Sequence, residues 1–398
     1  MKDVKIKKLI AAEKKRQKEV INLIASENYV SKDVLEALGS ELTNKYAEGY
    51  PSKRYYGGNE IVDQIETLCQ ERALKLFNLN SQEWHVNVQP LSGSPANTAV
   101  YTALVPPGGK IMGMSLDQGG HLTHGHKVSA TGKFWVQVPY GLDQTTETLN
   151  YDQLRELAVS QKPAVIVAGY TAYPRVIDWR RMREVADAAG ALLMVDMSHI
   201  AGLVAGRAYP SPFEYSDIVT TTTHKTLRGP RAALIFVKKD SRELDRKIDK
   251  AVFPGLQGGP HVNQIAAVAV ALNEANTPAF KKYAQQVIKN AAALASELQK
   301  RGWRLISGGT DSHLVLLDTW NDGHKNESGA GGVSGKDAST RLEKAGIIVN
   351  KNAIPFDKRP PADPSGIRLG SAAETSRGRK EKDFINIAKK IDKILKAD

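Results

Sequence analysis

The chain is poor in cysteine, with Cys69 as the single example among 398 residues. One thiol excludes a disulfide framework within the chain, and it excludes a zinc site built from several cysteines. Cys69 lies in a segment whose apolar side chains recur at helical spacing. Such a cysteine is far more often a small buried hydrophobic residue than a nucleophile. We therefore expect Cys69 to be part of the core.

Long hydrophobic runs are also missing. The longest apolar stretch near the middle of the chain, residues 265–272, is too short to span a bilayer. The first twenty residues are rich in lysine, contain acidic residues and lack the apolar centre of a signal peptide. They predict an amphipathic helix of the mature protein. We expect a cytoplasmic protein that does not associate with a membrane.

The charge is unbalanced but not clustered. Lysine and arginine number 55 against 43 acidic residues, which gives a net charge of +12. The sequence has no array of arginines interleaved with aromatic residues, as single-strand binders have. We do not expect nucleic-acid binding as the main role, although a basic nucleic-acid-binding protein without catalysis stays the alternative from a different class. The excess also suits an enzyme that handles anionic small molecules.

Short apolar segments alternate with helical patterns between residues 81 and 239. Alternation of this kind is typical of a mostly parallel sheet that helices cover on both faces. Gly190 closes one of the helical patterns in the manner of a C-terminal cap. The predicted strands lie within residues 110–116, 163–170, 191–199, 217–225 and 232–239, and the predicted helices within 151–161 and 178–190.

The pattern changes after Pro278, where a long helix over 279–301 is followed by strands and two further helices. We expect an N-terminal helical arm (1–40), a large domain (41–277) and a small C-terminal α+β domain (278–398). A Gly-Lys pair at Gly335–Lys336 fails the P-loop pattern because Asp337 stands where serine or threonine is needed. We therefore expect residues 321–337 to be a flexible surface connection.

Polar residues gather where predicted strands end. Asp196 and His199 follow one strand, His224 and Lys225 follow the next, and Thr171 follows a third. In an open α/β sheet, ligands bind in the crevice beyond the carboxyl ends of the strands. A lone lysine after a strand is usually a solvated loop residue. Lys225, however, follows four threonines and a histidine, which would make a poor core and a good site.

Two further segments carry candidate groups. Ser92-Gly93-Ser94 precede an apolar helix, where small residues let backbone N–H groups reach an anion. A simple serine cap of that helix is at least as compatible with the sequence. His121 has two histidines close behind it, but no acidic partner and no HExxH motif, so we expect no metal site. A stacking or acid–base histidine is the better interpretation.

Together these features suggest pyridoxal phosphate as a cofactor. A lysine in the crevice can form a Schiff base with it, and a carboxylate at a strand end can keep its pyridine nitrogen protonated. The N-terminus of the helix can hold its phosphate. Each feature is weak alone, but the set is specific.

Ten segments of the chain occur in the order found in one enzyme family: LIASENYVS, LTNKYAEGYPSKRYYGGNE, NVQPLSGSPAN, GGHLTHG, VDMSHIAGLVA, TTTTHKTLRGPR, AVFPGLQGGP, SGGTDSHL, VNKNAIPFD and SGIRLG. On these segments the sequence resembles serine hydroxymethyltransferase over nearly its whole length. The resemblance implies the pyridoxal-phosphate fold type I, an aspartate aminotransferase-like α/β fold with a mostly parallel seven-stranded sheet and a smaller C-terminal domain.

This resemblance implies the reversible conversion of L-serine and tetrahydrofolate to glycine and 5,10-methylenetetrahydrofolate, through an external aldimine and a quinonoid intermediate. A modified pterin in place of tetrahydrofolate stays open. Another enzyme of the same fold, such as a threonine aldolase or an aminotransferase, is the alternative within this class. The segments around Glu48 and His121 argue against it, since they carry the acid–base glutamate and pterin-side residues.

Individual cofactor contacts are implied as well. Lys225 matches the lysine of the Schiff base and Asp196 matches the partner of the pyridine nitrogen, which makes the ring an electron sink. Matching cofactor positions are Ser92, Gly93 and Ser94 for the phosphate, His121 for stacking on the ring, His199 for the phenolic oxygen, Tyr46, Thr171 and Arg231, and Gly258 and Gly259 for a partner subunit's phosphate.

The substrate side follows from the same resemblance. Arg368 matches the clamp on the amino-acid carboxylate, whose planar fork suits a bidentate ion pair, and Ser26 matches a second contact there. Glu48 matches the acid–base carboxylate near the serine hydroxyl, with Tyr56 beside it, and His224 matches a residue linked to reaction specificity. Leu116, Gly120, Leu122 and Asn352 match pterin contacts, and residues 360–362 depart from the bacterial pattern.

Assembly is the last implication. In the family, Tyr46, Glu48, Tyr56 and the Gly258–Gly259 loop reach into the neighbouring subunit's site. We therefore expect a homodimer with shared active sites, or a tetramer built from such dimers. The segment from residue 46 to 58 is polar, aromatic and rich in glycine, which suits an interface better than a core.

Overall fold

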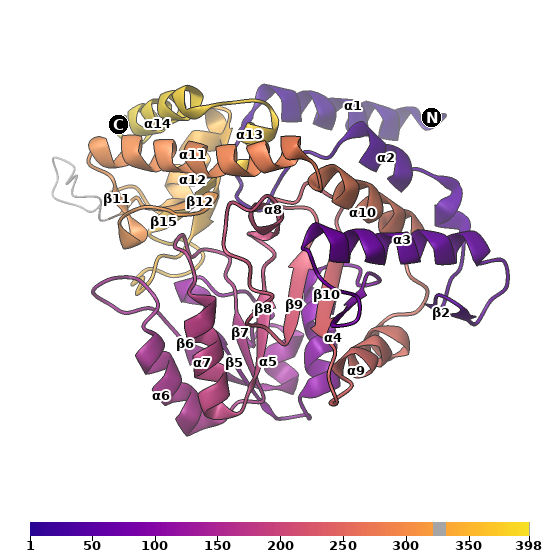
Figure 1. The fold of residues 1–398 in the computed structure, drawn as a ribbon. Helices are drawn as coiled ribbons and strands as arrows, with labels where there is room; N and C mark the ends of the chain where they lie inside the picture. The colour runs from indigo at the N-terminus through magenta and orange to yellow at the C-terminus, as the bar shows by residue number, and fades with distance from the viewer. Residues whose placement is uncertain (321–331, 398) are drawn as a thin grey trace.

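A seven-stranded sheet lies at the centre of the protein (Figure 1). The structure is a computed structural model, and it describes residues 1–320 and 332–397. The strand order across the sheet is β4-β10-β9-β8-β7-β5-β6. The strands are β4 (Trp84–Asn87), β5 (Lys110–Met114), β6 (Val136–Tyr140), β7 (Val165–Ala168), β8 (Leu192–Asp196), β9 (Ile218–Thr222) and β10 (Ala233–Lys238).

Most neighbours in this sheet are parallel. Strands β9, β8, β7, β5 and β6 run in one direction, whereas β10 is antiparallel to both β9 and β4. The predicted mostly parallel sheet is confirmed, and each of the five predicted strands is present. The sequence reading missed β4 and β6, which are the two edge strands.

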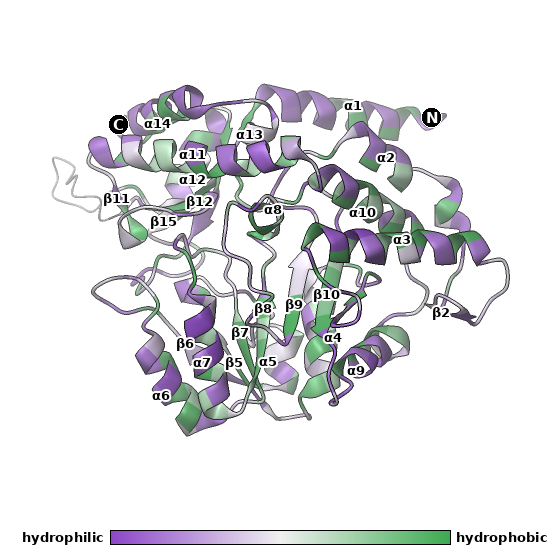
Figure 2. Cartoon of the chain, in the orientation of Figure 1, coloured by the Kyte–Doolittle hydropathy of each residue, from purple (hydrophilic) through white to green (hydrophobic). Residues whose placement is uncertain are grey.

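Both faces of the sheet are buried, which explains why its strands are continuous apolar runs. Alternate residues of a strand point to opposite faces. In β8, Leu193 and Val195 pack into one hydrophobic cluster while Met194 packs into another, and in β10 Phe236 and Ile235 divide in the same way. Figure 2 shows apolar strands between helices whose outer sides are hydrophilic.

Helices form the outer layers. The first cluster includes side chains of α3 (Glu60–Leu76), α6 (Tyr151–Gln161), α7 (Trp179–Ala189), α8 (Ala201–Ala205) and α10 (Val262–Ala275). The second includes side chains of α4 (Gly93–Leu104) and α9 (Leu244–Lys250). Cys69 of α3 is fully buried in the first cluster, as expected.

The local sequence explains where α7 begins and ends. The carboxylate of Asp178 accepts a hydrogen bond from the Arg181 N–H at 3.0 Å, which caps the first turn. Gly190 ends the helix with a positive φ of 65°, a conformation that costs glycine little. The predicted cap is thereby confirmed, and α6 has the predicted bounds.

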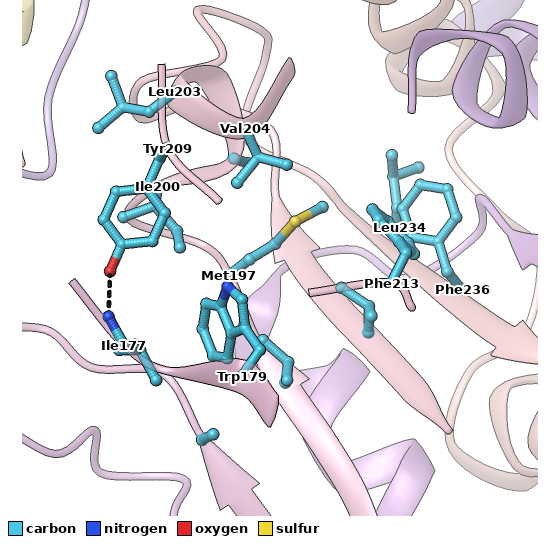
Figure 3. Packing of buried hydrophobic residues seen from close by; sticks show 14 of the residues in the cluster. Ile177, Trp179, Met197, Ile200, Leu203, Val204, Tyr209, Phe213, Leu234 and Phe236 are labelled. Carbon is cyan, nitrogen blue, oxygen red and sulfur yellow. Dashed lines mark hydrogen bonds between the residues drawn. The ribbon is translucent and has the colours of Figure 1, made fainter. Parts of the chain in front are cut away.

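Core side chains pack around Met197, the residue that follows β8 (Figure 3). Met197, the residue after that strand, is fully buried beside Trp179 and Ile200. The Tyr209 hydroxyl accepts a hydrogen bond from the Ile177 N–H at 3.1 Å, and this bond joins two segments of the same cluster. Tight packing at Met197 fixes the turn that carries the polar residues after β8.

A second, smaller lobe contains the four-stranded antiparallel sheet β11-β12-β15-β14. Its hydrophobic cluster includes side chains from three helices and from Leu23. The elements are α11 (Pro278–Lys300), β11 (Arg304–Leu305), β12 (Leu314–Asp318), α12 (Gly335–Lys344), β13 (Ile347–Ile348), β14 (Asn350–Asn352), β15 (Gly366–Gly370), α13 (Ala372–Ser376) and α14 (Glu381–Leu395).

Helix α11 belongs to both lobes. Phe280 and Val287 in its first half pack into the large lobe's cluster, whereas Leu294 and Leu298 in its second half pack into the small lobe's cluster. The domain boundaries predicted after residues 40 and 277 stay a prediction.

The expected surface connection is shorter than predicted. Gly335, Lys336 and Asp337 begin helix α12, and the Ser334 side chain accepts a hydrogen bond from the Asp337 N–H. A serine cap therefore starts a helix where we expected loop. Residues 332–334 precede this helix without regular structure, and residues 321–331 of the predicted connection lie outside the described residues.

The N-terminal segment forms the predicted helix, α1 (Val4–Glu19), which buries none of its residues. Strand β1 (Ile21–Asn22) then pairs in parallel with β13 of the small lobe. In the described part of the chain, no helix has both the length and the apolar character that a membrane crossing needs. The remaining elements are α2 (Lys32–Leu38), β2 (Gly49–Tyr50), β3 (Lys53–Arg54), α5 (Ala130–Phe134), three 3-10 turns, η1 (Glu41–Asn44), η2 (Leu116–Gln118) and η4 (Ile306–Gly308), and the π-helical turn η3 (Ala251–Leu256).

Candidate active site

A cavity of about 500 Å³ lies at the carboxyl ends of β7, β8 and β9. This is the edge of the sheet at which α/β proteins bind ligands. Residues from the N-terminal segment, the large lobe and the small lobe meet in it. The predicted site residues that line it are Ser26, Ser92, Gly93, Ser94, His121, Thr171, Asp196, His199, His224, Lys225, Arg231, Asn352 and Arg368.

Asp196 ends β8 and is 9% exposed. Its Oδ1 accepts hydrogen bonds from the Ser198 N–H at 3.1 Å and the Ser198 hydroxyl at 2.6 Å. Its Oδ2 accepts from the Asn97 amide at 2.9 Å and contacts His124 Nε2 at 3.2 Å. Both carboxylate oxygens are therefore held in place by neighbouring groups.

This environment keeps Asp196 ionised. Burial alone would raise the pKa of its carboxyl, but the hydrogen bond with His124 and the positive charges nearby hold that pKa well below its usual range. The cavity thus contains a fixed negative charge at physiological pH. A carboxylate in this state suits a protonated pyridine nitrogen.

Asn97 connects Asp196 to the histidine expected to stack on the cofactor ring. Its amide also donates to the Thr123 hydroxyl at 2.9 Å, and that oxygen lies 2.7 Å from His121 Nδ1. The Thr220 hydroxyl in turn donates to Asn97 Oδ1 at 2.8 Å, which fixes the amide's orientation. One chain of polar contacts therefore joins His121 to Asp196.

Lys225 is partly buried in the cavity wall. Burial lowers the pKa of its amine to about 8, Asp196 acts in the opposite direction, and Arg368 and Arg231 lower it further. A larger fraction of this amine is unprotonated near neutral pH than for a solvated lysine. Lysines of this kind are the ones that form Schiff bases readily.

Three histidines of the cavity, His121, His199 and His224, are neutral at pH 7. Burial lowers the pKa of His121 to about 4 and that of His224 to about 3, and it holds the pKa of His199 well below its usual range. Neutral imidazoles can stack and form hydrogen bonds without adding positive charge. No group of three or more His, Cys, Asp or Glu side chains suited to a metal occurs within residues 1–320 and 332–397.

The start of α4 fits an anion. Ser92 stands at its N-cap position, but its side chain makes no capping hydrogen bond, so the simple-cap interpretation does not hold. A Cβ at Gly93 would lie 2.7 Å from Thr222 Cγ2, so any larger residue there would require Thr222 to shift. Thr222 Oγ1 and His224 Nδ1 line the same cavity and are buried without a hydrogen-bond partner among the described residues.

Arg368 lies in β15 of the small lobe and is 9% exposed. Its guanidinium donates to the Thr171 carbonyl at 2.5 Å and to the Asn350 side chain at 3.1 Å. Burial lowers its pKa to about 10, which leaves it charged. Its contacts are neutral oxygens, so the charge is available to a carboxylate ligand.

Five predicted site residues form a cluster of their own outside this cavity. The Tyr46 hydroxyl donates to Glu48 Oε1 at 3.2 Å, and the Tyr46 and Tyr56 rings meet edge to face at 5.2 Å. A Cβ at Gly259 would lie 3.2 Å from the Tyr46 ring, and one at Gly258 would lie 3.3 Å from Glu48. We call these five residues the tyrosine–glutamate cluster.

Three predicted pterin contacts also lie outside the residues that line the cavity. Leu122 is 43% exposed, and Leu116 lies in the 3-10 turn η2. Gly120 contributes its carbonyl, which accepts a hydrogen bond from the Thr171 hydroxyl at 2.9 Å. Thr171 therefore links the Gly120 backbone with the backbone oxygen that holds Arg368.

Sequence reasoning missed several polar residues of the site. Asn97 and His124 hold Asp196 but were not assigned to it, and Ser198, Thr222, Tyr170 and Glu27 also belong to the site. A signal existed for Asn97, because it is a lone amide in an otherwise apolar helix. His124 is one of the two histidines that follow His121, and no role beside Asp196 was predicted for it.

A family model described as serine hydroxymethyltransferase matches residues 1–391. The chain belongs to the serine hydroxymethyltransferase family. It is 53% identical over 393 residues to the serine hydroxymethyltransferase of Desulfotalea psychrophila, covering 99% of this chain and 88% of that relative. The enzyme of Koribacter versatilis is 54% identical over 382 residues (96% and 86%), and that of Legionella pneumophila is 53% identical over 388 residues (98% and 90%).

Membership of the serine hydroxymethyltransferase family decides between the enzymes considered. The family consists of pyridoxal-phosphate-dependent one-carbon transferases that use tetrahydrofolate as co-substrate. The chain accordingly catalyses the family's reaction, in which serine and tetrahydrofolate give glycine and 5,10-methylenetetrahydrofolate. A threonine aldolase or an aminotransferase is thereby set aside. The site fits the family's cofactor in three respects: Asp196 is buried and ionised, the start of α4 at Gly93 fits an anion, and the pKa of Lys225 is lowered.

Proposed function

We propose that the cavity at the ends of β7, β8 and β9 is where this chain carries out the serine hydroxymethyltransferase reaction, with Lys225 as the lysine that binds pyridoxal phosphate. The observation that carries the proposal is the ionised Asp196 at the end of β8. When bound, the cofactor supplies an electron sink for the bond that breaks at the substrate Cα.

Asp196 would hold the proton on the pyridine nitrogen of the bound cofactor, and Asn97, His124 and Ser198 hold Asp196. His121 would stack on the ring of the bound cofactor, and its neutral imidazole permits this because a charged one would repel a protonated pyridine. Around them, Ser92, Gly93 and Ser94 bind the phosphate, and His199, His224, Thr171 and Arg231 complete the cofactor site.

Arg368 binds and orients the carboxylate of serine, with Ser26 as a second contact. A bidentate pair would fix the rotation of the amino acid in the cavity and so hold the reacting bond in one orientation. Asn352, Leu116, Gly120 and Leu122 form the side that receives the pterin. Tetrahydrofolate is the co-substrate we propose there.

We also propose that two subunits share their active sites. The tyrosine–glutamate cluster supports this, because Glu48 is the proposed acid–base group for the serine hydroxyl and yet lies outside the cavity of its own chain. Tyr46 and Tyr56 are 54% and 50% exposed in the single chain, which suits residues that a partner covers. A two-fold dimer would bring the cluster to the partner's cavity. We place the enzyme in the cytoplasm, in line with its bacterial relatives.

The lysine assignment is tested by replacement. Lys225→Ala and Lys225→Arg are expected to bind cofactor but to lose multiple turnover, because neither supplies an amine that can form and exchange a Schiff base. Lys390→Ala, which removes an exposed lysine of α14, is the matched control and should keep its activity. Normal steady-state turnover by either Lys225 variant would show that another lysine acts.

The shared site is tested by complementation. Lys225→Ala chains and Glu48→Gln chains are unfolded, mixed and reassembled. With random pairing, about half of the dimers are mixed, and each mixed dimer has one intact site, so activity should return to roughly a quarter of wild type. Activity that stays at the parental level, although differential tags show mixed dimers, would mean that each site is self-contained.

A further inference from the structure

Asn28 makes contacts that no part of the proposed reaction uses. It lies two residues after Ser26, in the segment that leads from β1 toward the cavity. Its side-chain amide donates to the backbone carbonyl of Lys225 at 3.0 Å and to the Tyr283 hydroxyl at 2.8 Å. A residue of the N-terminal segment therefore holds the backbone from which the catalytic lysine extends.

The orientation of this amide is determined by its partners. Asn28 Oδ1 accepts hydrogen bonds from the Tyr29 N–H at 2.9 Å and from the Ser376 hydroxyl at 2.6 Å. A backbone N–H can only donate and the Lys225 carbonyl can only accept, so the amide cannot turn over without losing both contacts. Asn28 is thus a fixed link between Lys225 and α13.

Tyr283 of α11 contacts both Asn28 and the loop that follows Lys225. The Arg228 guanidinium lies over the Tyr283 ring at 4.9 Å, and the Arg228 N–H donates to the same Lys225 carbonyl at 3.1 Å. Arg228 has a φ of 63°, a conformation that a non-glycine residue adopts only when its surroundings impose it. The loop after Lys225 is therefore held in a strained turn by Asn28, Tyr283 and Arg228, which we call the lysine-loop clamp.

The same N-terminal segment is attached to the strand that carries Arg368. The Leu23 carbonyl accepts a hydrogen bond from the Gly370 N–H at 2.7 Å, two residues beyond Arg368 in β15. A Cβ at Gly370 would lie 2.4 Å from the Ala25 backbone, so the segment and the strand are in close contact. The six residues from Leu23 to Asn28 therefore connect the Arg368 strand with the Lys225 loop.

We propose that Asn28 is a positioning residue that fixes the Lys225 backbone relative to the Arg368 strand. The inference rests on the proposed roles of Lys225 and Arg368, whose reactive groups come from different lobes. A side chain that joins the two keeps the amine and the carboxylate clamp at one spacing. Loss of such a spacing by about 1 Å can lower a rate by about a hundredfold.

The first test needs no cofactor. In the apoprotein, the reactivity of Lys225 toward an amine-acylating reagent is followed against pH by mass spectrometry of its peptide. The charged groups that act on this amine are Asp196, Arg368 and Arg231, and none of them is changed by Asn28→Ala. The wild-type midpoint is expected near pH 8. Asn28→Ala should move it upward by roughly half a unit to one unit, because a loosened loop admits water to the amine.

The second test uses the holoenzyme. Asn28→Ala is expected to lower kcat by about tenfold or more while the KM for serine changes by less than about threefold, because Arg368 and Ser26 stay intact. Tyr283→Phe removes only the hydroxyl of the clamp and keeps the ring under Arg228. It should raise the Lys225 labelling midpoint and lower kcat, each by a smaller amount than Asn28→Ala does. It replaces Asn28→Ala as the test variant if Asn28→Ala does not fold.

Asn290→Ala is the matched control. Asn290 is another asparagine bonded to α13, fully buried where Asn28 is partly buried, and its amide donates to the Thr375 hydroxyl at 2.8 Å and the Arg379 carbonyl at 2.9 Å. It lies on α11, and these two hydrogen bonds do not involve the lysine loop. We expect it to lower thermal stability as much as Asn28→Ala does, with the Lys225 midpoint and kcat unchanged.

Two results would overturn the inference. One is a Lys225 midpoint and a kcat in Asn28→Ala that match wild type. The other is a loss of activity that Asn290→Ala reproduces in proportion to its loss of stability, because that would make Asn28 merely structural. Failure of the underlying function would look different, since Lys225→Ala would then turn over normally while the labelling result for Asn28→Ala stood unchanged.

Discussion

Replacing Asp196 by asparagine removes one charge and almost no volume. An amide does not favour a protonated pyridine nitrogen as a carboxylate does, so the electron sink at the substrate Cα weakens. Loss of a preorganised charge of this kind lowers kcat by about 10²–10³, or about 2.7–4 kcal/mol of barrier. We expect Asp196→Asn to fall in this range.

The hydrogen bonds around Asp196 also predict a loss of stability. Oδ1 accepts two hydrogen bonds from Ser198, and Oδ2 accepts from Asn97 and contacts His124. Whichever way the new amide turns, its NH2 group faces the Asn97 amide or the Ser198 N–H, which are donors that cannot switch to accepting in place. Loss of one hydrogen bond to a charged group costs about 1.5–3 kcal/mol, so the apoprotein should unfold at a lower denaturant concentration.

The assay has two parts. Steady-state turnover of serine with tetrahydrofolate gives kcat, and pH-dependent acylation of the apoprotein gives the pKa of Lys225. Burial lowers the Lys225 pKa to about 8 and Asp196 opposes that effect, so the asparagine variant should have a Lys225 pKa below about 8. A lower kcat together with this downward shift is the expected pair of results.

Asp217→Asn is the matched control. Asp217 is another carboxylate beside the sheet, bound to Arg183 at 2.7 Å and Arg242 at 2.7 Å, but it does not line the cavity. It should lose stability and keep kcat. If Asp196→Asn stayed within about threefold of the wild-type rate, under about 1 kcal/mol of barrier, the role given to Asp196 would be refuted.

Further predictions concern the carboxylate clamp and pH. Arg368→Ala should raise the KM for serine steeply and lower kcat. Arg368→Lys should recover only part of either loss, because an ammonium cannot form the planar two-point contact. Unchanged serine kinetics in Arg368→Ala would show that Arg368 does not belong to the site. Because folding lowers the Lys225 pKa from 10.5 to about 8, the unfolded chain binds more protons between these values. The contribution of Lys225 to the stability of the apoprotein should therefore rise from pH 8 to pH 10.5. Denaturant unfolding of wild type and Lys225→Met at both pH values would measure this contribution as the difference between their free energies of unfolding. The same difference at both pH values would contradict the prediction.

The sequence predicted the large sheet well because its strands are buried on both faces. A run such as residues 191–195 is apolar throughout, and its shortness favours a buried strand over a helix. The edge strand β6 was missed because its exposed positions break the run, with Val136 half-exposed and Pro139 within it. Edge strands tolerate such residues, and so they resemble loops in sequence.

The site was predictable where residues follow strands and unpredictable where contacts cross the chain. Asp196 and Lys225 stand at strand ends, and the topology brings them to one edge. The partnership of Asn97 with Asp196 joins residues 99 positions apart, and no local pattern encodes it. Asn28 and Lys225 are 197 positions apart, so only the folded chain reveals that contact.

Helix α11 has a consequence for how the protein unfolds. Its 23 residues extend about 35 Å, and the two hydrophobic clusters each take one half of it. If the packing of one cluster were lost, α11 would lose half of the contacts that keep it helical. The second cluster would then be destabilised too, because it packs against the same helix. The two lobes should therefore unfold in a single cooperative transition. A fragment that starts at Pro278 would expose Phe280, Tyr283 and Val287 to water and would be prone to aggregate.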